Sequence, residues 1–432
     1  MAYKNSILLV EMTLLITCVA SFNNIQSVHS APSDSFTVPC RIDTYGQAWE
    51  GYLAFGLFRN FNSTNSSATA SYLVVMGTNG ELLYSRKSPG WTYNGAVKYM
   101  GNDTLMYPQA GTHFWNLKTN VTTDFPNVYG HHDMEYNPVT NTFLTLRAYQ
   151  RDINGTKVTF DKVVELNDKG EILWTWDTYD YTNLSEACPF CYPGKINGET
   201  VLDFTHSNSL QWDYTKNIVY LNVRNLNTFY KINKTTGELI WSCGEHGDFT
   251  LLDANGKKVP SLWYHSHAVK EVEPNVFIMF DNDYHNITHP FSGNSRILEV
   301  TLNEQNMTAW VSWSWAVPRE YWSPYWGKAD RLPNGDRIGT FGTETHSKYE
   351  NIFPNSTGAV LLEVNPKGEV VRTYTFPFGW GIYRIEEIGS DWNIIPEFPL
   401  DAREVVLAAG LAVSTLAGKI KISRRKFPTL PN

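Results

Sequence analysis

The sequence predicts an all-β protein, a six-bladed β-propeller built from four-stranded antiparallel blades, on three observations. Aromatic residues make up 14% of the 432-residue chain and charged residues only 18%, and aromatic and β-branched side chains favour strands. Two hairpin phrases alternate along the chain, as expected for a repeat architecture. No amphipathic helical pattern alternates with the strands, which argues against a parallel α/β fold. A pair of β-sandwiches and a seven-bladed propeller are the alternatives.

The first hairpin phrase predicts the outer two strands of each blade. It consists of a polar residue, a glycine and then alternating apolar residues, as in residues 79–84 and 169–174. Glycine or asparagine supplies the positive φ that a tight hairpin turn needs. The six predicted turn positions, spaced 40 to 71 residues apart, are Gly80, Asn120, Gly170, Gly237, Thr308 and Gly368.

The second phrase predicts the inner two strands, and most histidines lie in or beside it. It covers residues 132–147, 206–224, 267–281 and 327–340. The innermost strand of each propeller blade lines the central channel, so polar residues there should converge. Seven of the 11 histidines fall at these places: His131, His132, His206, His265, His267, His285 and His346.

Both chain ends have the pattern of targeting segments, outside a propeller domain that we place at residues 36–390. Lys4, an apolar run over residues 7–22 and small residues around Ser30 predict a secretory signal over residues 1–30, with an uncleaved anchor as the alternative. An apolar run at residues 405–418 precedes a basic cluster. It predicts a sorting signal or membrane anchor over residues 394–432, with a terminal core helix as the alternative. In the order of its parts, an apolar run followed by a basic cluster, this segment is similar to the C-terminal sorting signals of archaeal surface proteins.

The sequons and cysteines fit the extracellular or cell-surface location that these ends predict. A high density of Asn-x-Ser/Thr sequons is typical of a glycosylated exported protein. The sequon asparagines are Asn62, Asn65, Asn102, Asn120, Asn154, Asn183, Asn233, Asn286, Asn306 and Asn355. Outside the signal, Cys40, Cys188, Cys191 and Cys243 allow three pairings. A structural disulfide at Cys188-x-x-Cys191 is favoured over zinc, because no second Cys-x-x-Cys exists.

The charge balance argues against a nucleic-acid partner. The chain has 35 basic and 43 acidic residues and a net charge of -8. Proteins that bind nucleic acid normally carry a basic excess.

The histidine phrases carry a resemblance to a known family. Residues 203–209, Asp-Phe-Thr-His-Ser-Asn-Ser, resemble the Asp-Trp-x-His-x-Asn-Ser phrase of the arylsulfate sulfotransferases. Further matches are His131-His132-Asp133, His267 with Phe280-Asp281-Asn282, Ser295-Arg296 and the turn at residues 332–335. The resemblance extends over residues 91–383. It implies a six-bladed, exported propeller that transfers a sulfuryl group from an aryl sulfate to a phenol through a sulfated histidine. No cofactor or metal is expected.

The resemblance also implies roles for individual residues. A sulfate ester needs cations and donors around its oxygens, and a neutral imidazole can attack sulfur. His346 takes the place of the nucleophile, and His206 and His267 would hold sulfate oxygens or act as acid. His285 stands where the family has its catalytic arginine, and either His285 itself or Arg296, Arg147 or Arg224 takes that role; His285 and Arg296 are therefore candidate catalytic residues. The candidate substrate-binding residues are His131, His132, Asn208, Asn282, Arg147 and Arg224.

Two functions of other classes remain as alternatives. A noncatalytic surface propeller could bind glycans or a partner protein through an aromatic platform. The residues in question are Trp310, Trp313, Trp315, Trp322 and Trp326, although packing between blades is the more common use of tryptophan in such a core. A quinoprotein-like dehydrogenase would need a calcium carboxylate cluster, which the sequence does not display. Convergence of His206, His267 and His346 on one place would favour the enzyme.

Overall fold

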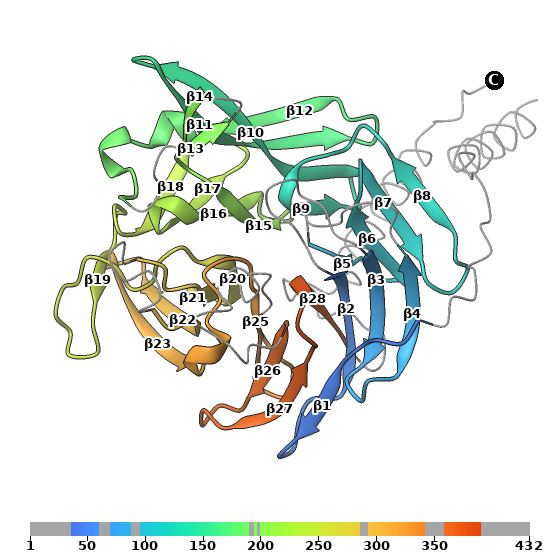
Figure 1. The fold of residues 1–432 in the computed structure, drawn as a ribbon. Coiled ribbons are helices and arrows are strands. Elements are labelled where there is room, and N and C mark those ends of the chain that lie inside the picture. The colour runs from blue at the N-terminus through green and yellow to red at the C-terminus, as the bar shows by residue number, and fades with distance from the viewer. Residues whose placement is uncertain are drawn as a thin grey trace, which may run out of the picture. The chain divides into compact units, whose positions relative to one another are not determined.

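The predicted fold class is confirmed. The computed structural model describes residues 36–59, 70–87, 96–189, 194–196, 199–285, 293–341 and 358–389. These residues form six antiparallel sheets that are arranged around an axis as a six-bladed β-propeller (Figure 1). The blades form from alternating apolar strands because each sheet buries its two faces against its neighbours in the ring.

Each blade has four strands, counted from the propeller axis outward (Figure 1). The innermost strands are β28 (Trp380–Gly389), β5 (Lys98–Tyr99), β9 (His131–Asn137), β15 (Ser207–Asp213), β20 (His267–Glu273) and β24 (Ala329–Arg331). The second strands are β2 (Gly51–Arg59), β6 (Thr104–Pro108), β10 (Thr142–Ile153), β16 (Ile218–Val223), β21 (Val276–Asp281) and β25 (Arg337–Phe341). The third strands are β3 (Ala70–Gly77), β7 (Thr112–Asn116), β11 (Thr156–Asn167), β17 (Thr228–Asn233), β22 (Arg296–Asn303) and β26 (Val360–Val364). The outer strands are β4 (Leu82–Lys87), β8 (Thr122–Phe125), β12 (Ile172–Asp177), β18 (Leu239–Gly244), β23 (Thr308–Ala316) and β27 (Val370–Thr375).

The last strand closes the ring against the first blade. β28 pairs antiparallel with β2, with Tyr52 opposite Ile388 and Arg59 opposite Trp380. At the outer edge of the last blade, β1 (Arg41–Thr44) pairs with β27. The first blade therefore takes its innermost strand from the far end of the chain.

Several short strands and 3₁₀ helices are additional to the four strands of each blade. β14 (Glu199–Asp203) runs parallel to β11, and β13 (Gly194–Ile196) pairs with β14. β19 (Thr250–Leu252) runs parallel to β23. The 3₁₀ helices are η1 (Thr178–Tyr181), η2 (Leu184–Glu186), η3 (Arg224–Leu226) and η4 (Arg319–Tyr321). Among the described residues, no helix is long and apolar enough to span a membrane.

Five of the six predicted outer turns have the expected backbone. Gly80, Gly170, Gly237 and Gly368 have φ values between 77° and 89°, and Asn120 has a φ of 56°. The prediction of Thr308 is wrong by one residue. Met307 takes the positive φ of 48°, because Thr308 already pairs with Asn303 as the first residue of β23.

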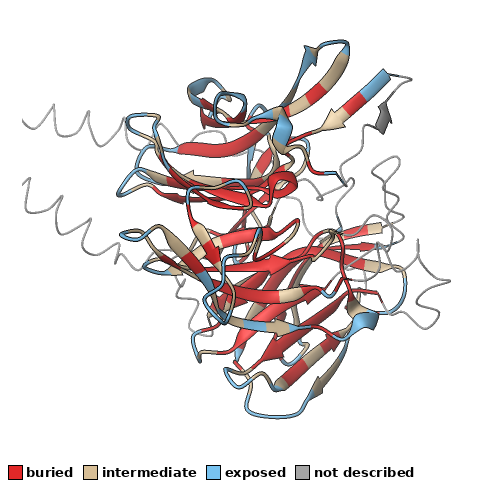
Figure 2. Ribbon diagram, turned by 90° about the vertical axis from the view of Figure 1, so that its left-hand side faces the viewer, coloured by how far each residue is buried: buried red, intermediate tan, exposed pale blue. Residues whose placement is uncertain are grey.

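The hydrophobic core lies between neighbouring blades. In the cluster between the third and fourth blades, Leu144 and Phe160 pack with Leu210 and Trp212. Figure 2 shows the same distribution, with buried residues along the strands and exposed residues mainly in turns and at outer edges. Full burial of a side chain such as Phe160 stabilises the fold by about 1.5–3 kcal/mol.

Four of the five tryptophans discussed above are used in packing. Trp322 and Trp326 are buried. Trp313 and Trp315 donate hydrogen bonds to the carbonyls of Pro366 and Gly368 in the next blade. Trp310 alone of the five is exposed.

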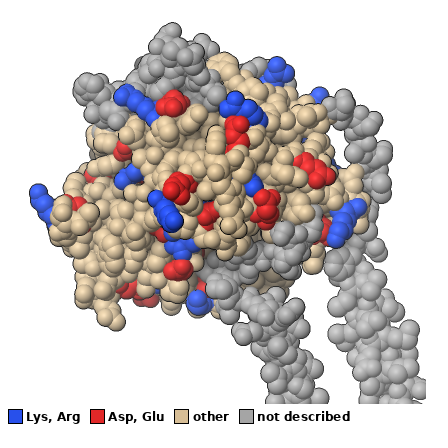
Figure 3. Space-filling model, turned by 90° about the horizontal axis from the view of Figure 1, so that it is seen from below, with Lys and Arg blue, Asp and Glu red and all other residues tan. Residues whose placement is uncertain are grey.

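Several sequence predictions fall outside the described residues. These are the N-terminal signal, the C-terminal segment, Cys191 and His346. Among the described cysteines, Cys40 and Cys243 are free thiols, and the expected Cys188–Cys191 disulfide involves a cysteine outside the described residues. On the face shown in Figure 3, acidic and basic side chains are interspersed rather than gathered by sign.

Candidate active site

Three histidines from three successive blades lie together near the propeller axis. His132 is on β9, His206 directly precedes β15 and His267 begins β20, and β15 contacts both neighbouring inner strands. The ring centres of His132 and His206 are 4.9 Å apart. Both rings also lie close enough to His267 to interact with it electrostatically. The structure therefore brings together three of the predicted site residues.

An irregular backbone directs these side chains. His132 and His206 have φ values of 63° and 46°, a left-handed conformation that costs a residue other than glycine about 1–2 kcal/mol. The pairing register of each inner hairpin shifts beside the histidine, and such bulges commonly re-aim side chains next to active sites. Gly130 is needed just before the first bulge, because a Cβ there would lie 2.0 Å from Oγ1 of Thr145.

The hydrogen bonds of Asn282 fix the tautomer of His267. The Asn282 amide nitrogen donates to the carbonyls of Ser323 and Trp326 at 2.6 and 2.9 Å. Its oxygen lies 2.6 Å from Nδ1 of His267 and can only accept, so Nδ1 carries the proton. In the neutral imidazole, Nε2 of His267 then bears the lone pair.

The other two rings are also held through Nδ1. Nδ1 of His206 lies 2.5 Å from a carboxylate oxygen of Asp203. Nδ1 of His132 lies 2.6 Å from Nδ1 of His131, whose Nε2 is 3.0 Å from Asp161. No residue within the described ranges forms a hydrogen bond with Nε2 of His132, His206 or His267. Three ring nitrogens are therefore left for a substrate.

Burial and neighbouring positive charge keep two of these rings neutral. The pKa of His132 is lowered well below 6.5 by burial first, and then by His131, His206, His267 and Arg384. The pKa of His267 is lowered well below 6.5 by burial, and then by Arg224 and Arg384. A neutral imidazole is the form that can attack an electrophile or accept a proton.

Arg384 is a central residue that the sequence analysis missed. It lies buried on β28, where its guanidinium donates to a carboxylate oxygen of Asp133 at 3.0 Å and to the carbonyl of Asn208 at 2.6 Å. Its position follows from the pairing of β28 with β2, which the sequence did not reveal. The available signal was an arginine between the apolar residues Tyr383 and Ile385.

Arg224 is the predicted arginine that reaches the histidine group. It is buried at the start of η3, and its nearest side-chain acceptor is Oδ1 of Asn225 at 2.6 Å. It forms no ion pair with a carboxylate in the described part of the chain. Its charge is therefore available for an anion beside His267.

The remaining predicted cations have other partners. Arg296 forms an ion pair with Asp281 at 2.5 Å, and Arg147 stacks on the ring of Tyr129 at 4.2 Å. His285 stacks on Tyr264 with ring centres 4.3 Å apart. It also pairs with Asp283 at 2.8 Å, and this contact, opposed by burial, raises the pKa of His285.

Asn208 connects blades rather than facing solvent. It is fully buried; its amide nitrogen donates to the carbonyl of Ser266 at 3.0 Å, and its amide oxygen accepts from Asn222 at 2.7 Å. Its carbonyl accepts from Arg384. The predicted substrate-binding residue thus holds the inner strands that carry the histidines.

Aromatic side chains surround the histidines and were not predicted as site residues. The ring of Tyr383 is 6.3 Å from that of His132 and 6.0 Å from that of Trp326. The half-buried rings of Tyr284 and Tyr325 are 6.0 Å apart, and the Arg224 guanidinium lies 5.9 Å from the Tyr325 ring. Aromatic faces next to the Arg224 guanidinium suit a ligand with a ring and a negative group.

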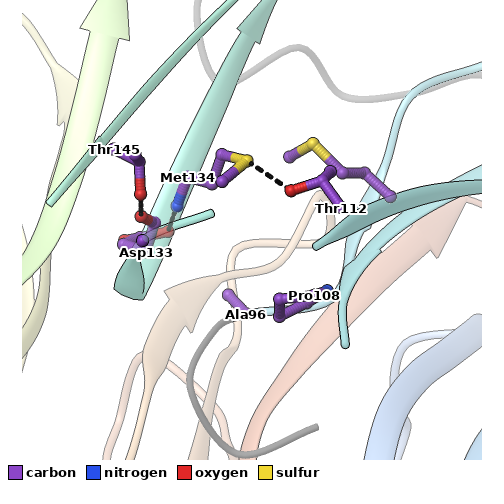
Figure 4. A pocket seen from close by; sticks show the side chains of 8 residues that line it. Ala96, Pro108, Thr112, Asp133, Met134 and Thr145 are labelled. Carbon is purple, nitrogen blue, oxygen red and sulfur yellow. Dashed lines mark hydrogen bonds between the residues drawn. The ribbon is translucent and has the colours of Figure 1, made fainter. Parts of the chain in front are cut away.

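Further along the inner strands the interior is filled by ion pairs. Asp133 also pairs with Lys98 at 3.1 Å, and Lys328 pairs with Glu387 at 2.8 Å. The cavity of about 10 Å³ beside Asp133, Thr112 and Met134 (Figure 4) holds one water at most. Within the ranges described, no three His, Cys, Asp or Glu side chains are grouped as metal ligands would be.

Comparison with known proteins gives one family and several structures of low similarity. The family described as arylsulfotransferase (ASST) matches residues 52–378, and no curated protein sequence matches the chain. A protein of unknown function from Bacteroides caccae is 13% identical, with a TM-score of 0.42 over 79% of this chain and 99% of that one. A periplasmic gluconolactonase from Pseudomonas aeruginosa is 7% identical, with a TM-score of 0.41 over 78% of this chain and 99% of that one.

Proposed function

Because the chain belongs to the arylsulfotransferase family, we propose that it transfers a sulfuryl group from an aryl sulfate to a phenol through a sulfated histidine. The observation that carries this proposal is the group of His132, His206 and His267 beside Arg224, a buried arginine that has no carboxylate partner among the described residues. Aryl sulfates combine a ring with a spread negative charge, which matches the aromatic and cationic side chains around the group.

In this proposal Arg224 neutralises the sulfate oxygens. A buried guanidinium is a strong donor to oxyanions because its charge is poorly screened. Tyr325 lies beside it and offers a face on which the aryl ring can stack. The negative charge that shifts between oxygens during transfer is then met by a fixed cation.

His206 acts as the acid in the first step. A histidine nucleophile attacks sulfur, the S–O bond to the aryl oxygen breaks, and the leaving phenolate takes the proton from Nε2 of His206. Asp203 lies on the other side of the ring, with a carboxylate oxygen 2.5 Å from Nδ1 of His206. Although burial raises the pKa of Asp203, the charge of His206 lowers it overall, so this carboxylate stays ionised.

The nucleophile in this proposal is His346, on the strength of its place in the sequence motif. Two-step transfer through a nucleophile lets different phenols accept the same group. In the second step the acceptor phenol loses its proton, its oxygen attacks sulfur, and the S–N bond breaks to free the histidine.

The test is an assay with 4-nitrophenyl sulfate and phenol, without nucleotide or metal. Formation of phenyl sulfate, and a sulfuryl adduct on the His346 peptide after rapid quenching, are expected. A leaving-group series adds a test of His206. Because 4-nitrophenolate departs readily without a proton, His206→Asn should slow transfer from phenyl sulfate more than transfer from 4-nitrophenyl sulfate. Equal losses with both donors would contradict the acid role.

We also propose that the protein is exported and held at the cell surface. The support is the N-terminal apolar run, the basic C-terminal segment and the exposed sequons at Asn102, Asn154, Asn183 and Asn306. Asn120 differs, because it is only half-exposed and its side-chain oxygen accepts from Trp115 at 2.9 Å. Glycopeptide mapping should find glycans at the four exposed sites before Asn120, and an intact, unmodified chain in the cytosol would contradict export.

A further inference from the structure

Asp161, His131 and His132 are linked by two short polar contacts, and the proposed chemistry gives this series of residues no role so far. Asp161 lies on β11, in the third strand of the blade whose innermost strand carries both histidines. Its carboxylate oxygen Oδ1 is 3.0 Å from Nε2 of His131. The opposite ring nitrogen of His131 is 2.6 Å from Nδ1 of His132. The series therefore runs from a buried carboxylate to a ring whose Nε2 has no hydrogen bond within the described residues.

The surroundings of Asp161 keep it an acceptor on both oxygens. Oδ2 accepts from the backbone N–H of Ser207 at 2.6 Å and from the hydroxyl of Thr205 at 2.7 Å. Although burial raises the pKa of Asp161, its contacts with His131, Thr205 and Ser207 lower it to about 2. An ionised carboxylate cannot donate, so His131 must carry a proton on Nε2.

The proton on Nε2 of His131 determines where the protons lie on the other ring nitrogens of His131 and His132. With one proton on His131, placed on Nε2 beside Asp161, its Nδ1 has a lone pair, so the short contact requires His132 to donate from its own Nδ1. Since burial and nearby positive charge keep His132 neutral, its Nε2 then has no proton. Two residues outside the reacting group thus decide which nitrogen of His132 is basic.

We infer that His132 is the general base that takes the proton of the acceptor phenol, and that Asp161 and His131 are positioning residues that set its tautomer. This inference rests on the proposed sulfuryl transfer. In the second step the phenol O–H bond breaks, its proton moves to Nε2 of His132, and the oxygen attacks sulfur. The Nδ1 proton of His132 passes to Nδ1 of His131, and the resulting cation lies against Asp161.

The two proton-transfer residues differ in their Nδ1 partner, and this difference assigns their roles. His206 has a carboxylate at that nitrogen, a negatively charged partner that suits the acid role. His132 has an imidazole, which favours a neutral ring and a base. The rings are neighbours, with centres 4.9 Å apart, so the proton gained by His132 in the second step replaces the one that His206 lost in the first. Divergent surroundings of paired titratable groups commonly separate acid from base.

Asp161→Asn tests the inference because the amide can adopt only one orientation. Its oxygen must face the N–H of Ser207 and the hydroxyl of Thr205, so its NH₂ group faces Nε2 of His131. His131 then accepts at Nε2 and donates from Nδ1, His132 accepts at Nδ1, and the proton of His132 moves to Nε2. The measurement is the ¹⁵N chemical shift of both His132 nitrogens in the full-length, histidine-labelled protein, with His132→Gln for assignment. The expected result is an exchange of the protonated and unprotonated nitrogens, and a fall in kcat/KM for the phenol of about 10²- to 10⁴-fold.

Two further variants keep the inference falsifiable. Asp203→Asn is the matched control, because no described donor binds the second oxygen of Asp203 and the amide can turn its oxygen toward His206. The ring of His206 should keep its Nδ1 proton. His131→Gln can place an amide nitrogen at Asp161 and an amide oxygen at His132, which preserves the His132 tautomer even if Asp161→Asn does not fold.

The outcomes separate this inference from the proposed function. An unprotonated Nε2 on His132 in the wild type, protonated in Asp161→Asn, supports the tautomer chain even in a protein that transfers no sulfuryl group. A wild-type His132 with its proton on Nε2, or one unchanged by Asp161→Asn, overturns it. A His132 that loses its Nδ1 proton in His131→Gln also overturns the tautomer chain. If Asp161→Asn folds and shows the exchanged His132 tautomer but keeps the wild-type kcat/KM for the phenol, the base role of His132 is overturned.

Discussion

Replacement of Arg224 by glutamine should remove the positive charge that the proposed site offers to the sulfate group. The guanidinium is buried and donates to an amide oxygen of Asn225 at 2.6 Å, with no carboxylate partner in the described residues. Loss of its charge therefore leaves no buried anion unpaired, and the cost to folding should be about 1 kcal/mol. A hydrogen bond to a charged group contributes about 1.5–3 kcal/mol, which corresponds to a fall of about 10- to 150-fold in kcat/KM.

The same variant should change His267 in a defined direction. Arg224 is the largest electrostatic cause, after burial, of the lowered pKa of His267, so Arg224→Gln should raise that pKa. The assay is kcat/KM for an aryl sulfate at fixed phenol, together with an NMR titration of His267. Arg151→Gln is the control, because Arg151 is exposed and stacks on Tyr179. Wild-type kcat/KM in a folded Arg224→Gln protein, with an unchanged His267 titration, would refute the assignment.

Three other measurements test the packing and charge of the propeller. The folded state binds a proton on His267 less readily than the unfolded chain does, so the free energy of unfolding should fall as pH drops below about 6.5; His267→Gln should reduce that slope by up to about 1.4 kcal/mol per pH unit. Arg384→Met should lower the free energy of urea unfolding by about 3–5 kcal/mol, since Asp133 loses one of its two cations; a loss below 1 kcal/mol would show that Lys98 suffices. Phe160→Ala, at a fully buried position between blades, should cost about 3–5 kcal/mol in the same experiment.

The sequence was informative where local chemistry determines the structure. Gly80 and Gly170 mark outer turns because a positive φ is inexpensive for glycine. The inner hairpins could be located from the turn residues between alternating strands, and His132, His206 and His267 follow from their place at the start of those hairpins. Propeller geometry brings equivalent positions of successive blades together, so this grouping could be predicted without any side-chain contact.

The arginines show why the rest of the site could not be predicted. Arg147 and Arg224 both end an inner hairpin, yet Arg147 stacks on Tyr129 while Arg224 is buried beside His267. The difference arises from local backbone: β10 continues straight past Arg147, whereas β16 ends at Val223 and η3 begins at Arg224. Arg384 depends on a still less local fact, the pairing of β28 with β2 across more than 300 residues. Hairpin periodicity predicts the strands and turns within a blade. The positions of the charged side chains at the axis depend instead on how the ring closes and on single-residue departures from regular strands.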